Sequence, residues 1–339
     1  MKTPARIGGG RRVVDALRAV LPPMVDVRHQ ATRDGTTTLA LGTKNVRAVW
    51  VGEGGLRHVR PLLTMSPRPH VAVARVMSPG ARAVLGKAGI GWADDTGAAE
   101  IALGTIIVSR TGRPRPRPAA ERIARWTPAA MAVAEALLCG TAATVAAAQR
   151  ATGLSTGSCI NALRTLTELK LLVSAMARGR GSARSVVDPD ALLDVYTTAV
   201  QAAPARASLV AGVSWRDLVT GLRDAGVGWS RGGLDWAATG AAGAALLAPL
   251  ATNVGAAEIY VNARTQAELA AVAARAGLAP LEGGRLTMKP FPTTTTIRMT
   301  QVIDGVRVAP WPRVYADVRL VGVRGEEMAE HLREVVRGR

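Results

Sequence analysis

Hydrophobic and polar positions change their spacing several times along the chain, and each change predicts a different element. Near the N-terminus the apolar residues form short runs rich in β-branched side chains, which is typical of strands. At residues 78–89 the spacing becomes helical, with Ser78 as N-cap, Pro79 in the first turn and Gly89 at the end. The predicted strands are residues 36–42, 46–52 and 70–76, with two more inside 90–110 around an Asp-Asp-Thr-Gly turn. This alternation predicts an α/β domain over residues 1–109.

The middle of the chain begins with helical segments. Residues 126–140 have Thr127 as N-cap and Pro128 as the first helical residue. A shorter helix over about 145–151 stops at Gly153, a residue that suits a left-handed helix end. Another helical pattern follows at once, so the two helices are joined by a tight turn.

This next helix has one apolar and one polar face. Its N-cap is either Ser155 or Thr156, and its apolar stripe is Cys159, Leu163, Leu166 and Leu169. The opposite face carries short hydrogen-bonding side chains, as a helix that enters a DNA major groove needs. The residues predicted to face base edges and adjacent phosphates are Ser155, Thr156, Ser158, Asn161, Arg164 and Thr165.

A basic hairpin is predicted next. Residues 171–176 and 184–188 have strand character, and the tip between them is rich in glycine and arginine. Glycines let a tip approach a DNA backbone, and arginines meet phosphates or enter the minor groove. The predicted contacts are Arg178, Arg180, Ser182 and Arg184. In this order the elements predict a winged helix-turn-helix domain over residues 126–200, although each element alone also occurs as ordinary packing with a solvated polar face.

The C-terminal part alternates helices and strands again. A strand, a Thr-Gly turn and a small-residue helix are predicted within residues 233–249. Further helices are predicted at 214–226, 265–278 and 324–339, and a further strand at 256–263. These elements predict a second α/β domain over residues 208–339.

Two breaks separate the three parts. Prolines alternate with arginines between Ser109 and Trp126, which forbids a helix and disfavours a paired strand. We therefore expect a stiff basic linker at residues 110–125, and a second break at 201–212. The linker arginines are expected to follow the DNA backbone with little sequence preference: Arg110, Arg113, Arg115, Arg117, Arg122 and Arg125.

The charge points to an anionic partner. The formal net charge of the 339 residues is +18, which favours nucleic acid or an anionic surface. The excess of arginine over lysine fits a high-GC genome, so codon usage accounts for part of it. The surplus is +13 in residues 1–125, +1 in 126–195 and +4 in 196–339. It therefore lies in the N-terminal part and the linker rather than in the predicted recognition helix.

Two features bear on the compartment. Cys139 and Cys159 are too few for a disulfide framework and lack the spacing of a zinc site, so both are expected to be small buried residues. The N-terminus lacks an uninterrupted apolar segment, and the longest apolar run, 236–250, is too short to span a bilayer. We expect a cytoplasmic, nucleoid-associated protein with no membrane partner.

Three groups of residues together resemble the actinobacterial AbiEi-like family, the antitoxins and transcriptional regulators of type IV toxin–antitoxin systems. They are residues 153–166 with 178–184, residues 236–261, and residues 312–335. Residues 78–103 also look like the segment that precedes the winged helix in longer members, so the resemblance extends from about residue 60 to the end. It implies DNA binding by the winged helix, often for autoregulation, and a C-terminal domain related in fold to nucleotidyltransferases.

Neither α/β domain has the residues of a working catalytic site. A nucleotidyltransferase needs two carboxylates one residue apart on a strand to hold magnesium. Thr239-Gly240 supplies part of the turn and Glu258 one carboxylate, but Tyr260 takes the paired position. We expect a degenerate nucleotidyltransferase-like domain that serves as a scaffold.

The N-terminal domain has the outline of a degenerate restriction-endonuclease-like fold. That chemistry needs an Asp and then Glu-x-Lys on the next strand. Asp34 can supply the first group, but neither Lys44 nor Glu53 completes the second. Asp94 and Asp95 are adjacent and fit turn chemistry. The histidines are scattered at 29, 58, 70 and 331. We predict no catalytic residue, no metal, no cofactor and no enzymatic activity.

The sequence thus predicts an α/β (α+β) multidomain protein with a central winged helix-turn-helix between two α/β domains. Its predicted function is sequence-specific binding of double-stranded DNA and regulation of transcription. Two alternatives stay open: an antitoxin that neutralises a nucleotidyltransferase toxin by protein–protein contacts, and a metal-dependent nuclease. A second copy of the chain is a further expected partner where the operator is palindromic.

Overall fold

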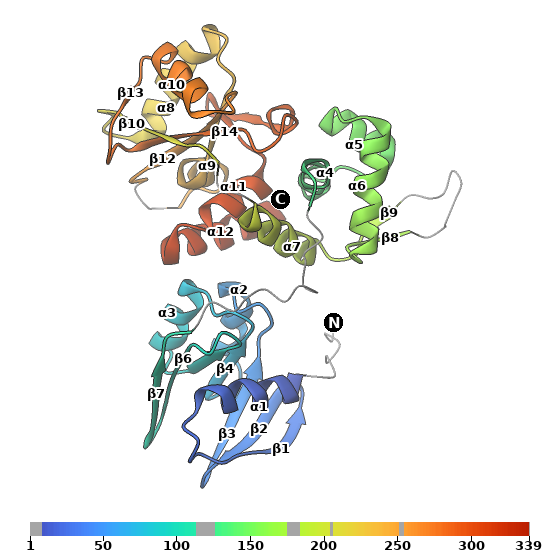
Figure 1. The fold of residues 1–339 in the computed structure, drawn as a ribbon, viewed down its shortest axis with the longest axis vertical. Helices are drawn as coiled ribbons and strands as arrows, with labels where there is room; N and C mark the ends of the chain where they lie inside the picture. Colours follow the sequence, from blue (N-terminus) through green and yellow to red (C-terminus); the bar gives the residue numbers. More distant parts are fainter. Residues whose placement is uncertain (1–8, 113–125, 175–183, 204–205, 251–253, 339) are drawn as a thin grey trace. The chain divides into compact units, whose positions relative to one another are not determined.

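The computed structural model describes residues 9–112, 126–174, 184–203, 206–250 and 254–338 (Figure 1). The chain divides into two compact units, residues 1–120 with 322–327 and residues 121–321 with 328–339. Both units combine helices with a seven-stranded sheet, so the predicted α/β multidomain class is confirmed at that level. The predicted linker residues Arg113, Arg115, Arg117, Arg122 and Arg125 lie outside the described residues.

The first unit is built on a mixed sheet whose strands lie side by side in chain order. They are β1 (Val27–Arg33), β2 (Thr36–Leu41), β3 (Lys44–Trp50), β4 (Val71–Ala74), β5 (Gly91–Asp94), β6 (Ala99–Leu103) and β7 (Ile106–Arg110). The β3–β4 and β4–β5 pairs are parallel and the others antiparallel. The sheet therefore carries its only parallel strands at its centre, where both faces are covered.

Helices cover both faces of this sheet. α1 (Gly9–Val20) packs on one face, and α2 (Leu56–Val59), the 3-10 helix η1 (Arg60–Leu63) and α3 (Pro79–Lys87) pack on the other. Strand β4 shows the reason, since its alternate residues belong to different cores. Val71 and Val73 lie in the core with α1, and Ala72 and Ala74 lie in the core with α3.

The predicted elements of the first unit are present, with three differences. The three predicted strands and the helix at 78–89 are confirmed, and Ser78 Oγ accepts a hydrogen bond from the Ala81 amide (3.2 Å). The sequence prediction omitted α1, β1, α2 and the 3-10 helix η1. Residues 90–110 form three strands instead of two, because Gly104 with φ +65° makes a second turn. Arg110 ends β7 and donates to the Ala19 carbonyl (3.0 Å), so its assignment to the linker was wrong.

The second unit begins with helices and a hairpin. These are α4 (Pro128–Leu138), α5 (Val145–Thr152), α6 (Thr156–Glu168), the strands β8 (Leu172–Ser174) and β9 (Arg184–Val186), and α7 (Pro189–Ala202). Thr127 caps α4, since its Oγ1 accepts from the Ala130 amide (3.1 Å). Gly153 ends α5 at φ +72°, a conformation that favours glycine. Ser155, not Thr156, caps α6.

A second mixed sheet follows, in the order β13-β10-β14-β12-β11-β16-β15. Its strands are β10 (Leu209–Gly212), β11 (Trp236–Thr239), β12 (Ala257–Val261), β13 (Ala279–Pro280), β14 (Leu286–Pro290), β15 (Gln301–Ile303) and β16 (Val306–Val308). The β12–β14 and β11–β16 pairs are parallel and the rest antiparallel. The helices are α8 (Leu218–Arg231), α9 (Gly240–Leu247), α10 (Gln266–Arg275), α11 (Trp311–Val318) and the 3-10 helix η3 (Thr296–Met299). The last helix, α12 (Gly322–Arg337), belongs to this unit from residue 328 onward, and its residues 322–327 belong to the first unit.

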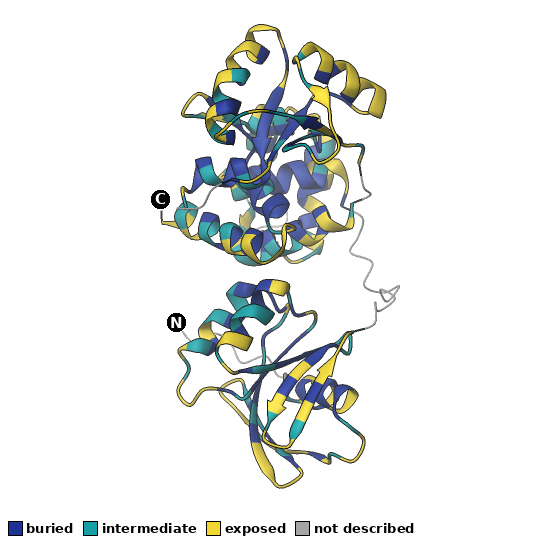
Figure 2. Cartoon of the chain, turned by 90° about the vertical axis from the view of Figure 1, so that its left-hand side faces the viewer, coloured by how far each residue is buried: buried dark blue, intermediate teal, exposed yellow. Residues whose placement is uncertain are grey.

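The helices α4–α7 and this sheet share one hydrophobic core. Leu163 of α6, Tyr196 of α7 and Trp236 of β11 all belong to a single buried cluster. The Trp311 indole N–H also donates to the Leu138 carbonyl (3.2 Å), which joins α11 to the end of α4. Figure 2 shows the buried residues gathered in the strands and on the inner sides of the helices.

The two cysteines differ in their exposure to solvent. Cys159 is buried as predicted, but Cys139 is exposed because it follows the last turn of α4. None of the described helices is both long and apolar enough to cross a bilayer.

Candidate nucleic-acid interface

The exposed side of α6 is the surface on which the sequence placed base-reading residues. We call it the α6 face; it consists of Ser155, Thr156, Gly157, Ile160, Asn161 and Arg164, all of them exposed. The opposite stripe is closed, because Cys159, Leu163 and Leu166 have no exposed surface. That stripe and Ala162 anchor α6 against α4 and α5, so the helix is held firmly while its polar side stays open.

Short hydrogen bonds order the side chains of the α6 face. Gln149 of α5 donates to Thr156 Oγ1 (2.9 Å), and Ser155 Oγ donates to Ser158 Oγ (3.0 Å). Arg164 donates to Asn161 Oδ1 (2.9 Å). These bonds leave the Asn161 amide nitrogen and the second lone pair of its oxygen unused, and those are the groups that pair with an adenine edge.

The remaining predicted residues of α6 are less open. Ser158 and Thr165 are half-buried, and the Thr165 hydroxyl donates to the Asn161 carbonyl (3.0 Å). Glu168 lies 3.9 Å from Arg164 at the C-terminal end of the helix, where its charge would repel a phosphate. The N-terminal half of α6 is therefore the more suitable half for contact with DNA.

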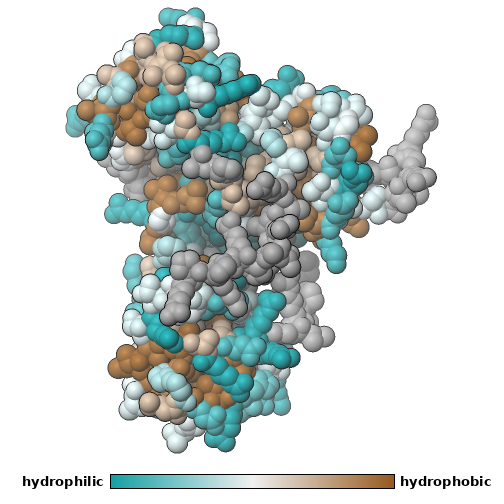
Figure 3. All heavy atoms as spheres, viewed as in Figure 1, coloured by the Kyte–Doolittle hydropathy of each residue, from teal (hydrophilic) through white to brown (hydrophobic). Residues whose placement is uncertain are grey.

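Sequence reasoning missed two exposed residues near this face. Ile160 is 44 % exposed although it is apolar, and it lies one turn after Thr156 and one turn before Arg164. Arg150 is exposed in the last turn of α5. Ile160 is apolar and Arg150 lies on α5, so neither belongs to the polar side of α6. Their helical spacing was the only feature of the sequence that indicated their exposure. In the space-filling view the α5–α6 surface is mostly pale to hydrophilic with a few hydrophobic residues (Figure 3).

The predicted hairpin is present at its base. Leu172 pairs with Val186 and Ser174 with Arg184, and Ala143 forms a further bridge to Arg184. Arg178, Arg180 and Ser182 lie outside the described residues. Arg184 is half-buried, and its Nε is buried without a hydrogen-bond partner among the described residues. Of the four predicted hairpin contacts, the structure thus locates Arg184, at the strand end nearest the tip.

The predicted degenerate catalytic position is occupied by a closed group of side chains. We call it the Asp317 network. Asp317 accepts hydrogen bonds from Thr239 (2.6 Å) and Tyr260, and its other oxygen lies 3.2 Å from Arg313 Nε. Arg313 also donates to the Tyr260 hydroxyl (2.8 Å). The nearby Glu258 instead pairs with Lys289 (2.8 Å). Tyr260 thus binds the carboxylate of another element at the position where a second carboxylate was sought.

A buried acid extends the polar interior toward the helices. Glu135 of α4 has no exposed surface and accepts a hydrogen bond from Tyr196 of α7 (2.5 Å). Burial raises the pKa of Glu135 to about 7, an effect that the positive charge of Arg313 only partly offsets.

The residues considered for a nuclease serve local structure or lie apart. Asp34 lies in the turn between β1 and β2 at φ +50°, and Lys44 donates to the Leu103 carbonyl (3.3 Å). Asp94 is buried and accepts from the amides of Met77 (3.0 Å) and Thr96 (2.9 Å). Within the described part of the chain, no three histidine, cysteine or acidic side chains come together as they would around a metal ion.

Comparisons with known proteins add no relative: no family model matches the chain, and no curated protein and no solved structure matches it. The resemblance to AbiEi-like proteins therefore rests on the sequence motifs alone.

Proposed function

We propose that residues 126–200 form a winged helix-turn-helix domain and that the protein is a transcriptional regulator that binds double-stranded DNA with the α6 face. The observation that carries this proposal is an exposed, hydrogen-bonding helix face whose reverse side is fully packed, directly after the Gly153 turn and before a β-hairpin. A helix of 13 residues is about 20 Å long. That length suffices to lie in a major groove about 12 Å wide.

The proposal assigns different roles to different residues. Asn161 would pair with an adenine and Arg164 with a guanine or a phosphate, because their donors and acceptors fit those groups. Ser155 and Thr156 would bind the backbone near the helix N-terminus, where a helix favours anions. Arg113, Arg115 and Arg117, with the hairpin arginines, would neutralise phosphates without reading sequence.

The test begins by selecting duplexes from a random pool with the purified full-length chain. Affinity is then measured for the selected duplex and for random DNA at physiological salt. Asn161→Ala is expected to reduce the ratio of the two affinities about 5- to 150-fold, since one bidentate base contact contributes about 1–3 kcal/mol. Asn262→Ala is the matched control, because Asn262 is also exposed but follows β12 and is not part of the α6 face.

The linker provides the contrasting variant. Replacing Arg113, Arg115 and Arg117 with glutamine is expected to weaken both duplexes alike and to reduce the salt dependence. If no duplex is enriched in the selection, or if Asn161→Ala behaves like Asn262→Ala, the regulator proposal is wrong. Tight binding of an adjacently encoded nucleotidyltransferase in the absence of DNA binding would favour the antitoxin alternative instead.

A further inference from the structure

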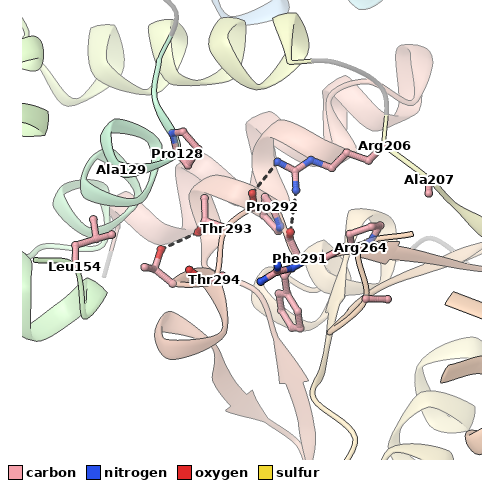
Figure 4. A pocket seen from close by; sticks show the side chains of 13 residues that line it. Pro128, Ala129, Leu154, Arg206, Ala207, Arg264, Phe291, Pro292, Thr293 and Thr294 are labelled. Carbon is pink, nitrogen blue, oxygen red and sulfur yellow. Dashed lines mark hydrogen bonds between the residues drawn. The ribbon is translucent and has the colours of Figure 1, made fainter. Parts of the chain in front are cut away.

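A cavity of about 560 Å³ lies in the second unit, between the start of α4, the α5–α6 turn and the segments that follow strands β12 and β14 (Figure 4). Cavities of this size accommodate small molecules. Arg264 follows β12 and Phe291 follows β14, so the cavity lies beyond the carboxyl ends of a parallel strand pair. Open α/β sheets commonly bind ligands at this end of their strands.

The charged residues in the lining are all cationic. They are Arg206 and Arg264, and none of the described residues that line the cavity carries a carboxylate. Arg206 donates to the carbonyls of Phe291 (2.8 Å) and Pro292 (2.7 Å), which fixes its guanidinium across the loop. Burial, and secondly the positive charge of Arg313, lower the pKa of Arg206. An anion in the cavity would relieve this unfavourable environment.

Arg264 has capacity for a ligand. Its guanidinium has no hydrogen-bond or ion-pair partner among the described residues, although its backbone amide donates to Glu268 (2.7 Å). The wall beside Arg264 is apolar, with Leu154 and Pro128 on the side of the helices. On the side of the sheet, the Phe291 ring packs on Tyr260 with 5.7 Å between the ring centroids. Figure 4 shows Leu154 and Arg206 at opposite sides of the cavity.

The cavity wall is continuous with the α5–α6 turn. Leu154 immediately precedes Ser155, the N-cap of α6. On the other wall, Thr293 bonds Thr295 (2.7 Å) and Thr296 (2.9 Å), and the segment continues into η3. There Arg298 lies against Gly153, so closely that a Cβ at residue 153 would meet its Nε at 2.9 Å. Both walls therefore touch the turn that positions α6.

We propose that this cavity binds a small organic anion, with its carboxylate or phosphate at Arg206 and Arg264 and its apolar part against Leu154 and Phe291. Such a ligand would bridge the two walls and hold the α5–α6 turn. The consequence for DNA binding rests on the proposed function, whereas the binding of the anion does not.

Calorimetric titration of the full-length chain tests the site with four probes: benzoate, adenosine monophosphate, inorganic phosphate and neutral benzamide. Benzoate or adenosine monophosphate is expected to bind more tightly than both phosphate and benzamide. Arg264→Gln should weaken that binding about tenfold or more, as the loss of a charge-assisted contact implies. Arg231→Gln is the matched control, because Arg231 is exposed at the end of α8 and does not line the cavity.

Three results would overturn the assignment: no binding of either organic anion, equal binding of benzamide, or unchanged binding in Arg264→Gln. Coupling to α6 is measured separately by hydrogen exchange, where the bound anion is expected to slow the amides of residues 154–158. Unchanged exchange with a bound probe would refute the coupling. Neither measurement uses DNA, so a failure of the proposed function leaves both results interpretable.

Discussion

The α6 face and the Asp317 network are both polar clusters, but their hydrogen bonds leave different groups available. On the α6 face the bonds join neighbours on the surface, and the amide nitrogen of the exposed Asn161 has no partner among the described residues. In the network, Asp317 is buried and accepts from Thr239 and Tyr260 while it pairs with Arg313. The number of partners already made, rather than the residue types, decides which cluster can bind another molecule.

The largest expected effect comes from a substitution that removes the central carboxylate of the Asp317 network. Asp317→Ala leaves the Arg313 guanidinium, whose side chain is 12 % exposed, without its ion-pair partner. We expect the free energy of unfolding to fall by about 3–5 kcal/mol, the usual loss when one partner of a buried pair is removed. Urea denaturation followed by tryptophan fluorescence measures it. Asp235→Ala, at an exposed position before β11, should change stability by less than about 0.5 kcal/mol. A loss below about 1 kcal/mol for Asp317→Ala would contradict the comparison.

A second prediction concerns pH and the neighbouring acid. The pKa of Glu135 is raised from 4.5 in the unfolded chain to about 7 in the fold. The folded state therefore binds the proton more tightly, and this stabilisation is complete below about pH 4.5 and is lost as pH rises through 7. The loss amounts to roughly 3 kcal/mol.

Glu135→Gln removes this dependence, since an amide does not titrate in the range. As the pH rises from about 5 to 8, the free energy of unfolding of wild type should fall relative to that of the variant. Glu282→Gln, at an exposed site, should run parallel to wild type. Parallel curves for Glu135→Gln as well would show that Glu135 keeps an ordinary pKa.

The smallest expected effect concerns the apolar residue of the α6 face, Ile160. Ile160 stands among polar residues of the α6 face, and a thymine methyl group is the apolar feature of the major groove. Ile160→Ala should weaken binding to the selected duplex by about 1 kcal/mol. Replacing the contacted thymine with uracil should weaken wild type similarly and leave the variant unaffected. Val302→Ala, at an exposed residue of β15, is the control. If the losses from Ile160→Ala and from the uracil substitution add in the doubly changed complex, Ile160 does not contact the thymine methyl group.

The sequence was sufficient where the determinants are local. Thr127, Gly153 and Ser155 end or begin helices through their own side chain or backbone, so the boundaries of α4, α5 and α6 were predicted closely. The apolar stripe of α6 identified its buried side for the same reason, since helical spacing alone sets which residues share a face.

Long-range pairing set the limit of prediction. The buried Glu135 accepts its hydrogen bond from Tyr196, which lies 61 residues later in the chain. The carboxylate near Tyr260 comes from Asp317 on α11, 57 residues away, whereas the sequence motif was sought within one strand. Strands β13, β15 and β16 have two or three residues each, too few for a periodic pattern. Ile160 and the cavity depend on which surfaces remain uncovered, which spacing alone does not reveal.

The hydrogen bond from the Trp311 indole to the Leu138 carbonyl has a consequence for how this architecture can be inherited. If a gene rearrangement moved only helices α4–α7 to another protein, the apolar residues that these helices bury against the C-terminal sheet would become exposed. Recombination that preserves function must therefore keep the C-terminal sheet with them. The breakpoints that such exchange tolerates lie outside the second unit.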